Sequence, residues 1–217
     1  ALKLSLLFLA GLAVLMVVPA GGLPGGVDWP SPRAGPDPES GQRILARFGV
    51  MYQSGALFGS MTLLENVRLP IEVYSGLPGD AMNLIARMKL ALVGLDAFTG
   101  HLPSEISGGM QKRAGIARAM ALDPSILFLD EPSSGLAPIT SATLDATVRR
   151  LAESLGVTFV IVTHDLPSVF ASIDRVVLLD KKARGIIAEG DPRELRDSSP
   201  DPRVRAFFRR EPEKAAA

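Results

Sequence analysis

Two neighbouring stretches are the most informative about this chain, Ser104-Glu-Ile-Ser-Gly-Gly-Met-Gln-Lys-Arg113 and Ile126-Leu-Phe-Leu-Asp-Glu-Pro-Ser-Ser-Gly-Leu-Ala-Pro138. The first contains a small-residue turn at 107–111 that opens a predicted helix, and a helix N-terminus with bare glycine amides suits a phosphate. The second contains an apolar strand ending in Asp130-Glu131, which offers one carboxylate to a metal and one to a water. Together they predict a nucleotide-handling site.

Strands and helices alternate on both sides of these stretches. Apolar runs predict strands at 48–52, 126–130, 157–163, 175–179 and 185–189. Capping residues predict helix starts at Thr62, Asp80, Asp191 and Asp201. We expect Pro70 to end the first helix. The second should bury a face made of Ala81, Leu84, Ile85, Met88 and Leu92. This alternation predicts an α/β fold with a mostly parallel sheet.

The composition excludes several kinds of protein and site. The chain has 217 residues, which is enough for one sizeable domain or two small ones. Its 23 basic and 23 acidic residues balance, so it provides no strong field for nucleic acid. It has no cysteine, which excludes disulfides and thiolate metal sites, and its two histidines disfavour a multi-histidine centre. We therefore expect no nucleic-acid partner.

The N-terminal part differs in composition from the rest. Leu4 to Ala20 is almost wholly apolar and is compatible with a signal or membrane anchor, or with a buried core helix. Residues 20–41 are rich in glycine and proline and predict an irregular connector. We therefore divide the chain into an atypical segment at 1–41, a domain at 42–211 and a tail at 212–217.

The two motifs, with Pro124 between them, resemble the ATP-binding subunit of ABC transporters over about residues 44–211. The resemblance implies a P-loop NTPase-type α/β nucleotide-binding domain with a helical subdomain near 54–120. Three strings are most similar to the ATPases of Mla-type lipid importers: Gln-Ser-Gly-Ala-Leu-Phe, Met-Thr-Leu-Leu-Glu-Asn-Val-Arg-Leu-Pro and the tail Asp-Pro-Arg-Val-Arg-Ala-Phe-Phe.

The resemblance also implies roles for single residues. Asp130 would hold Mg²⁺ and Glu131 would act as general base toward a water. His164 would bond the γ-phosphate, and Gln53 would contact the metal and the water. The ATP of an opposite subunit would be bound by the signature residues Ser107, Gly108, Gly109, Met110 and Gln111. The cofactors expected are ATP and Mg²⁺.

Three basic residues follow the signature turn, namely Lys112, Arg113 and Arg118. On a predicted helix they form one basic face. We interpret this face as a solvated side of the helix in preference to a binding surface.

Two features depart from the family pattern. No phosphate loop of the form G-x-x-x-x-G-K-[ST] precedes Gln53, because the glycine-rich run 21–26 carries no Lys-Ser. Ala137 stands where the family usually has aspartate, which puts coupling across a dimer in doubt. We therefore expect weak ATP binding and little turnover, in a chain whose N-terminal part is truncated or in a naturally degenerate subunit.

The resulting prediction is an ATPase subunit that couples ATP hydrolysis to lipid transport. Its partners would be transmembrane permease subunits and a second copy of the ATPase domain. It would lie peripherally on the cytoplasmic face of the inner membrane. The alternative is a non-catalytic interaction or regulatory subunit, tethered through residues 4–18, or a truncated gene product. An ABC ATPase used outside transport is disfavoured, because neither coiled-coil insertions nor duplicated domains are evident.

Overall fold

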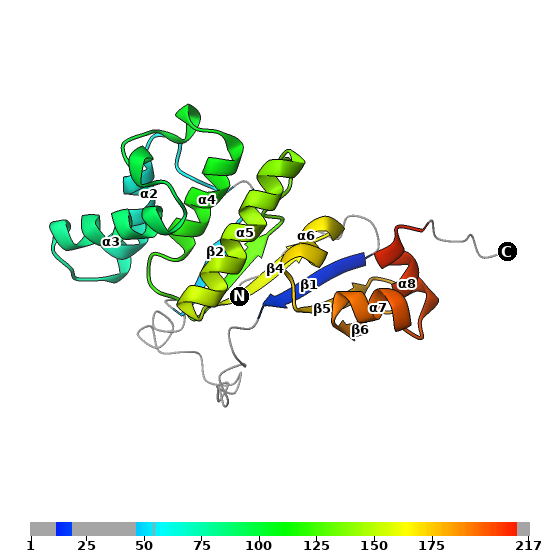
Figure 1. Ribbon diagram of the computed structural model, residues 1–217. Helices are drawn as coiled ribbons and strands as arrows, with labels where there is room; N and C mark the ends of the chain where they lie inside the picture. The colour runs from blue at the N-terminus through cyan, green and yellow to red at the C-terminus, as the bar shows by residue number, and fades with distance from the viewer. Residues whose placement is uncertain (1–11, 19–46, 54, 212–217) are drawn as a thin grey trace, which may run out of the picture.

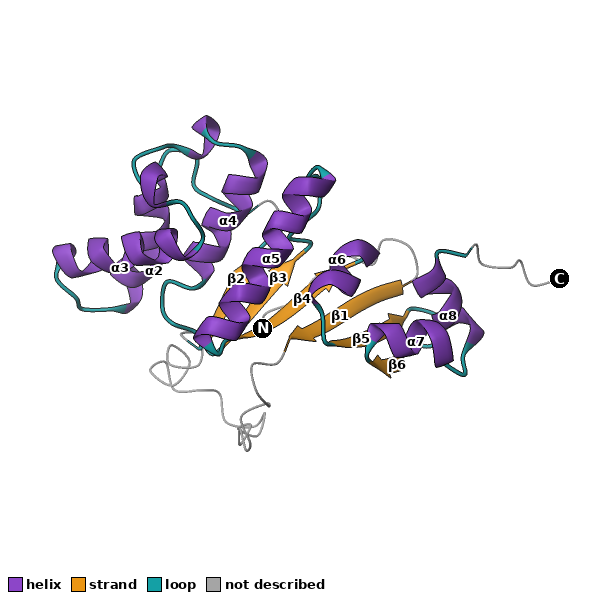
Figure 2. Cartoon of the chain, viewed as in Figure 1, coloured by secondary structure: helices purple, strands orange, loops and turns teal. Residues whose placement is uncertain are grey.

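A computed structural model describes residues 12–18, 47–53 and 55–211, which contribute a single six-stranded sheet with helices beside it (Figures 1 and 2). The strands lie in the order β2-β3-β4-β1-β5-β6. Their bounds are β1 Leu12–Val18, β2 Phe48–Met51, β3 Ile126–Asp130, β4 Thr158–Thr163, β5 Arg175–Asp180 and β6 Gly185–Gly190.

Most strands run in one direction. β2, β3 and β4 pair parallel, whereas β1 is antiparallel to both β4 and β5, and β6 is antiparallel to β5. Because β1 is antiparallel to both of its neighbours, β5 points the same way as β2, β3 and β4. The predicted α/β fold class is confirmed.

The helices form three groups along the sheet (Figure 1). α2 (Leu63–Tyr74), α3 (Gly79–Leu92) and α4 (Gly108–Ala119) pack together near β2, where we predict a helical subdomain. α5 (Pro138–Leu155) and α6 (Leu166–Ser172) lie over the middle of the sheet, and α7 (Pro192–Ser198) and α8 (Pro202–Arg209) lie near β6. Two short 3-10 helices, Asp96–Phe98 and Pro103–Glu105, precede α4.

The core joins the sheet to the helices above it. On β3, Leu127 and Leu129 are buried, and β4 is buried along nearly its whole length. On α5, Leu144, Val148 and Leu151 recur at helical spacing and belong to the same buried cluster. This packing holds the strand ends of β3 and β4 in place.

Three of the predicted helix starts are confirmed by their hydrogen bonds. Thr62 and Glu65 form a complete capping box at the start of α2. The Asp191 carboxylate accepts from the amides of the first turn of α7, and Asp201 does the same for α8. Each satisfies backbone donors that a helix leaves free at its N-terminus.

Three predictions about α2 and α3 are wrong. α2 does not end at Pro70 but continues to Tyr74, and the buried side chain of Ile71 anchors the turn after the proline. α3 has Pro78 rather than Asp80 at its N-cap position. Its buried face holds Ala86, Lys89 and Leu90, while Leu84 and Met88 are exposed, because packing against α2 and α4 selects a different side of the helix.

The expectation for the apolar N-terminal run is also corrected where the structure describes it. Residues 12–18 form strand β1 between β4 and β5, not a core helix or an anchor helix. A short apolar run cannot be assigned to helix or strand by periodicity alone. Residues 4–11 and the connector at 20–41 lie outside the described residues. Among the helices of the described ranges, none is long and apolar enough to cross a bilayer.

The contact between β2 and the end of α4 depends on Gly49. A β-carbon at this position would overlap the Ala119 carbonyl oxygen and the Leu127 side chain. We therefore predict that Gly49→Ala lowers the free energy of unfolding by about 1–3 kcal/mol, as overpacking usually does. Urea unfolding followed by circular dichroism measures this change. Gly59→Ala is the matched control, since nothing lies within 4 Å of its added carbon; equal losses in the two variants would contradict the prediction.

Candidate functional site

The candidate site lies where three parallel strands end. Met51 pairs with Leu129, and Asp130 pairs with Val162, so β2, β3 and β4 finish at the same edge of the sheet. Gln53 follows β2, Asp130-Glu131 closes β3, and His164 follows β4. The structure thus brings together at one edge the four residues to which the resemblance gives metal and catalytic roles.

Glu131 is the most tightly held of the four. Its backbone is left-handed, with φ 44°, and its amide donates to the Val162 carbonyl at 2.8 Å. One carboxylate oxygen lies 2.5 Å from His164 Nδ1, and the other accepts from the Thr163 hydroxyl at 3.1 Å. The Glu131 side chain is 18% exposed, and that of His164 is 75% exposed. The turn therefore aims a partly buried carboxylate at a solvent-facing imidazole.

Asp130 is placed differently from its neighbour. It is exposed, and no hydrogen bond to its carboxylate is found within the described residues. Among these residues, no cluster of three or more His, Cys, Asp or Glu side chains could hold a metal by itself. A single free carboxylate suits Mg²⁺, which keeps several waters and takes few protein ligands.

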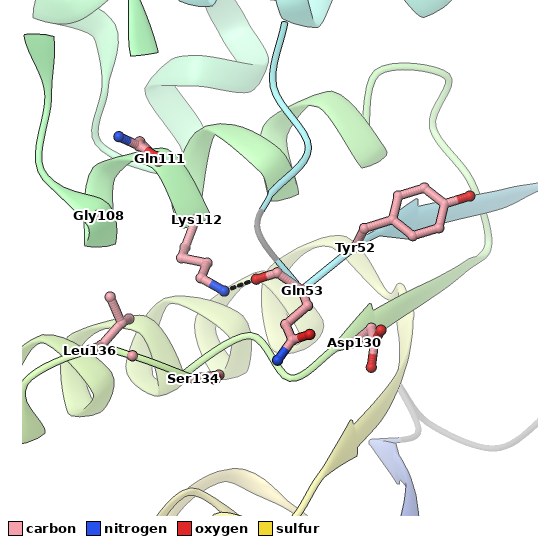
Figure 3. Close-up of a pocket in the computed structure, with 9 residues that line it drawn as sticks. Tyr52, Gln53, Gly108, Gln111, Lys112, Asp130, Ser134 and Leu136 are labelled. Atoms are coloured by element: carbon pink, nitrogen blue, oxygen red, sulfur yellow. Dashed lines mark hydrogen bonds between the residues drawn. The ribbon is translucent and has the colours of Figure 1, made fainter. Parts of the chain in front are cut away.

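A pocket of about 520 Å³ joins the strand ends to the signature helix. It is lined by Tyr52, Gln53, Gly108, Gln111, Lys112, Asp130, Ser134, Gly135 and Leu136. Figure 3 shows Lys112 reaching from α4 to the Gln53 carbonyl above the Asp130 carboxylate. Of the predicted site residues, Gln53, Gly108, Gln111 and Asp130 line this pocket, while the others lie outside its lining.

The signature turn has the predicted helix start. Ser107 is the N-cap residue of α4, and its hydroxyl accepts from the Met110 amide at 3.3 Å. Gly109 packs closely on α5, because a β-carbon there would overlap the Thr140 side chain, which would have to shift. The Gln111 amide donates to the Pro103 carbonyl at 2.8 Å, so this side chain secures the preceding turn.

The basic face of α4 is not solvated, which corrects our interpretation. Lys112 is buried and donates to the Gln53 carbonyl, and its ammonium lies 3.5 Å from the Glu131 carbonyl. Arg113 donates to the Val93 carbonyl at 2.8 Å, and Arg118 donates to two loop carbonyls. Burial lowers the pKa of the Lys112 ammonium, while the charges of Asp130 and Glu131 oppose this shift.

A polar cluster between α5 and α6 supports the chain just after His164. The Ser168 hydroxyl donates to Asp165 at 2.7 Å and lies 3.4 Å from the Ser141 hydroxyl. Burial raises the pKa of the nearby Asp145 carboxyl; a hydrogen bond with Ser168 lowers it, and the charge of Asp165 raises it.

The comparisons with known proteins concern the family and the fold of the chain. A family model described as ABC transporter matches residues 27–134. The phospholipid transport ATP-binding protein MlaF of Escherichia coli K12 is 43% identical over 166 residues, which cover 76% of this chain and 60% of MlaF. A dimeric ATP-binding cassette bound to ADP and Pi superposes with a TM-score of 0.61 at 30% identity, over 72% of this chain and 67% of that one.

The chain belongs to the ABC transporter family. The predicted resemblance to Mla-type ATP-binding subunits is confirmed. Among other similar proteins of this family, the probable ribonucleotide transport ATP-binding protein mkl of Mycobacterium tuberculosis is 41% identical over 165 residues, which cover 76% of this chain and 45% of mkl. CbiO1 of Clostridium perfringens superposes with a TM-score of 0.65 at 26% identity, over 73% of this chain and 62% of its own. The chain thus spans 60% of the length of MlaF.

Ala137 occupies a position where an aspartate would have a structural use. It is the N-cap residue of α5 and makes no side-chain capping bond. We predict that Ala137→Asp raises the free energy of unfolding by about 0.5–2 kcal/mol, because its carboxylate can accept from the free amides of the first turn. Urea unfolding at pH 7 measures the gain. Ala146→Asp, at an exposed position inside α5, is the control and should give no gain; equal effects would contradict a capping role.

The raised pKa of Asp145 predicts a pH dependence of stability. The folded chain holds this proton more tightly than the unfolded chain. The free energy of unfolding should therefore fall as the pH rises from about 4 through the raised pKa. Asp145→Asn removes the ionisation, so the variant should become more stable relative to the wild type across that window. Urea unfolding over a pH series tests this, and parallel curves would contradict it.

Proposed function

We propose that this chain is the ATP-binding subunit of a membrane transporter, and that it couples ATP hydrolysis to the transport of a phospholipid or a related lipid. The observation that carries the proposal is the Glu131–His164 pair, at 2.5 Å, placed beside the free carboxylate of Asp130 at one sheet edge. The similarity to MlaF supports the cargo class.

The residues at the edge fit ATP and Mg²⁺. Asp130 and the Gln53 side chain would hold the metal, which neutralises phosphate charge when bound. The signature residues 107–111 would present a hydroxyl and backbone amides to the phosphate of a nucleotide on a second copy of the chain. Lys112 adds a buried cation to the same pocket.

Glu131 is the proposed general base. It would take the proton of the attacking water on a carboxylate oxygen, while Thr163 keeps the other oxygen in place. With a proton on Nδ1, His164 donates to Glu131 and holds its anion in this orientation. When the imidazole is doubly protonated, its other ring nitrogen can also donate to a phosphate oxygen.

We expect weak binding and slow turnover in this chain. Its sequence carries no G-x-x-x-x-G-K-[ST] loop, so neither the backbone cradle nor the lysine of that motif reaches the β- and γ-phosphates.

The proposed partners are permease subunits and a second copy of the ATPase domain. Large apolar side chains are exposed near the Gln53 loop and on α2, α3 and their connection, namely Tyr52, Phe58, Val73, Tyr74, Leu77, Leu84 and Met88. Exposed apolar groups of this kind are typical of protein interfaces. They support docking to a permease at the cytoplasmic face of the inner membrane, where the subunit would lie peripherally.

The cargo rests on similarity alone. MlaF is named for phospholipid transport and mkl for ribonucleotide transport, at 43% and 41% identity. The higher identity to MlaF supports a lipid. An ATPase subunit does not itself contact the cargo, so the site residues do not distinguish the two.

Calorimetry of the purified chain with Mg²⁺ and ATP tests the nucleotide site. We predict a dissociation constant on the order of 1 mM, which is about 4 kcal/mol of binding. Glu131→Gln should bind equally well and release no phosphate, because it removes the base but keeps the shape. Asp130→Asn should reduce the gain in affinity that Mg²⁺ gives.

Two outcomes would contradict the proposal. No heat at several millimolar ATP would exclude a working nucleotide site in this chain. Phosphate release by Glu131→Gln at the wild-type rate would exclude Glu131 as the base.

A further inference from the structure

The basic residues of α4 and the Gln53 loop (Gln53 and residues 55–58) are joined by several contacts that the proposed chemistry does not use. Lys112 donates to the Gln53 carbonyl. Arg118 donates to the Gly55 carbonyl at 2.9 Å and to the Ala56 carbonyl at 2.7 Å. Two cations of one helix therefore satisfy three carbonyls of one loop.

Gly115 lies between the two cations and lets the loop approach the helix. A β-carbon on Gly115 would lie 3.1 Å from the Gly55 Cα and 3.3 Å from its carbonyl oxygen. Residues 112, 115 and 118 are spaced by three, which places them on one side of a helix. The loop thus rests directly on the backbone of α4.

The far end of the loop is fixed by a different helix. The Asn66 side chain of α2 is fully buried, accepts from the Phe58 amide at 2.8 Å and donates to the Phe58 carbonyl at 3.1 Å. The Arg118 guanidinium also lies 5.8 Å from the centre of the Phe58 ring. Without the contacts to α4, the loop would keep the bonds of Phe58 to Asn66, the bond of the Gly55 amide to the Tyr52 carbonyl and the packing of Leu57 on the core.

We propose that Lys112, Gly115 and Arg118 form a clasp that holds the Gln53 loop on α4 and thereby sets the position of Gln53 relative to Asp130-Glu131. The three act as positioning residues. This inference rests on the proposed function for its purpose, while the clasp itself can be measured without nucleotide.

Lys112 connects the clasp to the carboxylate edge. Its ammonium bonds the Gln53 carbonyl and lies 3.5 Å from the Glu131 carbonyl, so one side chain spans the ends of β2 and β3. Because ammonium hydrogen bonds to carbonyls are charge-assisted, this link is stronger than a neutral one.

Hydrogen exchange of the nucleotide-free full chain tests the clasp. The reporters are the Gly55 amide, which donates to the Tyr52 carbonyl, and the Phe58 amide. We expect Arg118→Ala to speed exchange at 55–58 on the order of tenfold, as the loss of charged hydrogen bonds predicts. Gly115→Ala should speed it several-fold with no change of charge. Arg118→Lys keeps the charge and one bond, and should restore part of the protection.

Arg113→Ala is the matched control. It removes a cation of the same helix whose bond goes to Val93 rather than to the loop. Urea unfolding of each variant separates local opening from a global loss of stability.

The proposal is overturned when the Arg118→Ala and Gly115→Ala loops exchange at the wild-type rate, or when Arg113→Ala speeds them equally. If the Arg118→Ala and Gly115→Ala variants exchange faster but the wild-type chain binds no Mg-ATP, the clasp is supported and the proposed function is contradicted. The two failures are thus distinguishable.

Discussion

The parallel pairing of β2, β3 and β4 is the constraint on which the candidate site depends. Parallel strands in register end at one edge, so the residues that follow them meet although they lie far apart in sequence. Gln53, Asp130 and His164 reach this edge from three separate strands. A one-residue slip of β3 would send Asp130 to the opposite face and break the site, and the buried side chains of Leu127 and Leu129 prevent such a slip.

The left-handed backbone at Glu131 gives the neighbouring carboxylates of Asp130 and Glu131 different surroundings. Such a conformation is unfavourable for a residue with a side chain and persists where surrounding contacts hold it. Here the Val162 carbonyl fixes the Glu131 amide, while Thr163 and His164 fix its carboxylate. Asp130 keeps its carboxylate free. Two adjacent acids are thereby given different surroundings, which suits one to a metal and the other to a proton.

The sequence predicts the residues at the edge well, because each follows an apolar strand or caps a helix. Asp130-Glu131, His164 and Ser107 are found where the local patterns place them. Prediction from the sequence fails where tertiary contacts determine which residues are buried or paired. The side of α3 that is buried depends on its packing against α2 and α4. The placement of β1 depends on its pairing with β4 and β5, which lie far from it in the sequence. The burial of Lys112 and Arg118 depends on loop carbonyls that no local pattern reveals, although the glycine between them was a usable sign of close backbone approach.

Helix α4 takes part in three of the features described above. Its first turn is the signature, its middle holds the Gln53 loop, and its last residue packs on β2 at Gly49. A buried ammonium costs desolvation energy, which the carbonyls around Lys112 and the charges of Asp130 and Glu131 offset. Removing either carboxylate charge would therefore remove part of the electrostatic compensation for burying Lys112. The charges at the sheet edge are in this way coupled to the burial of Lys112 on the signature helix.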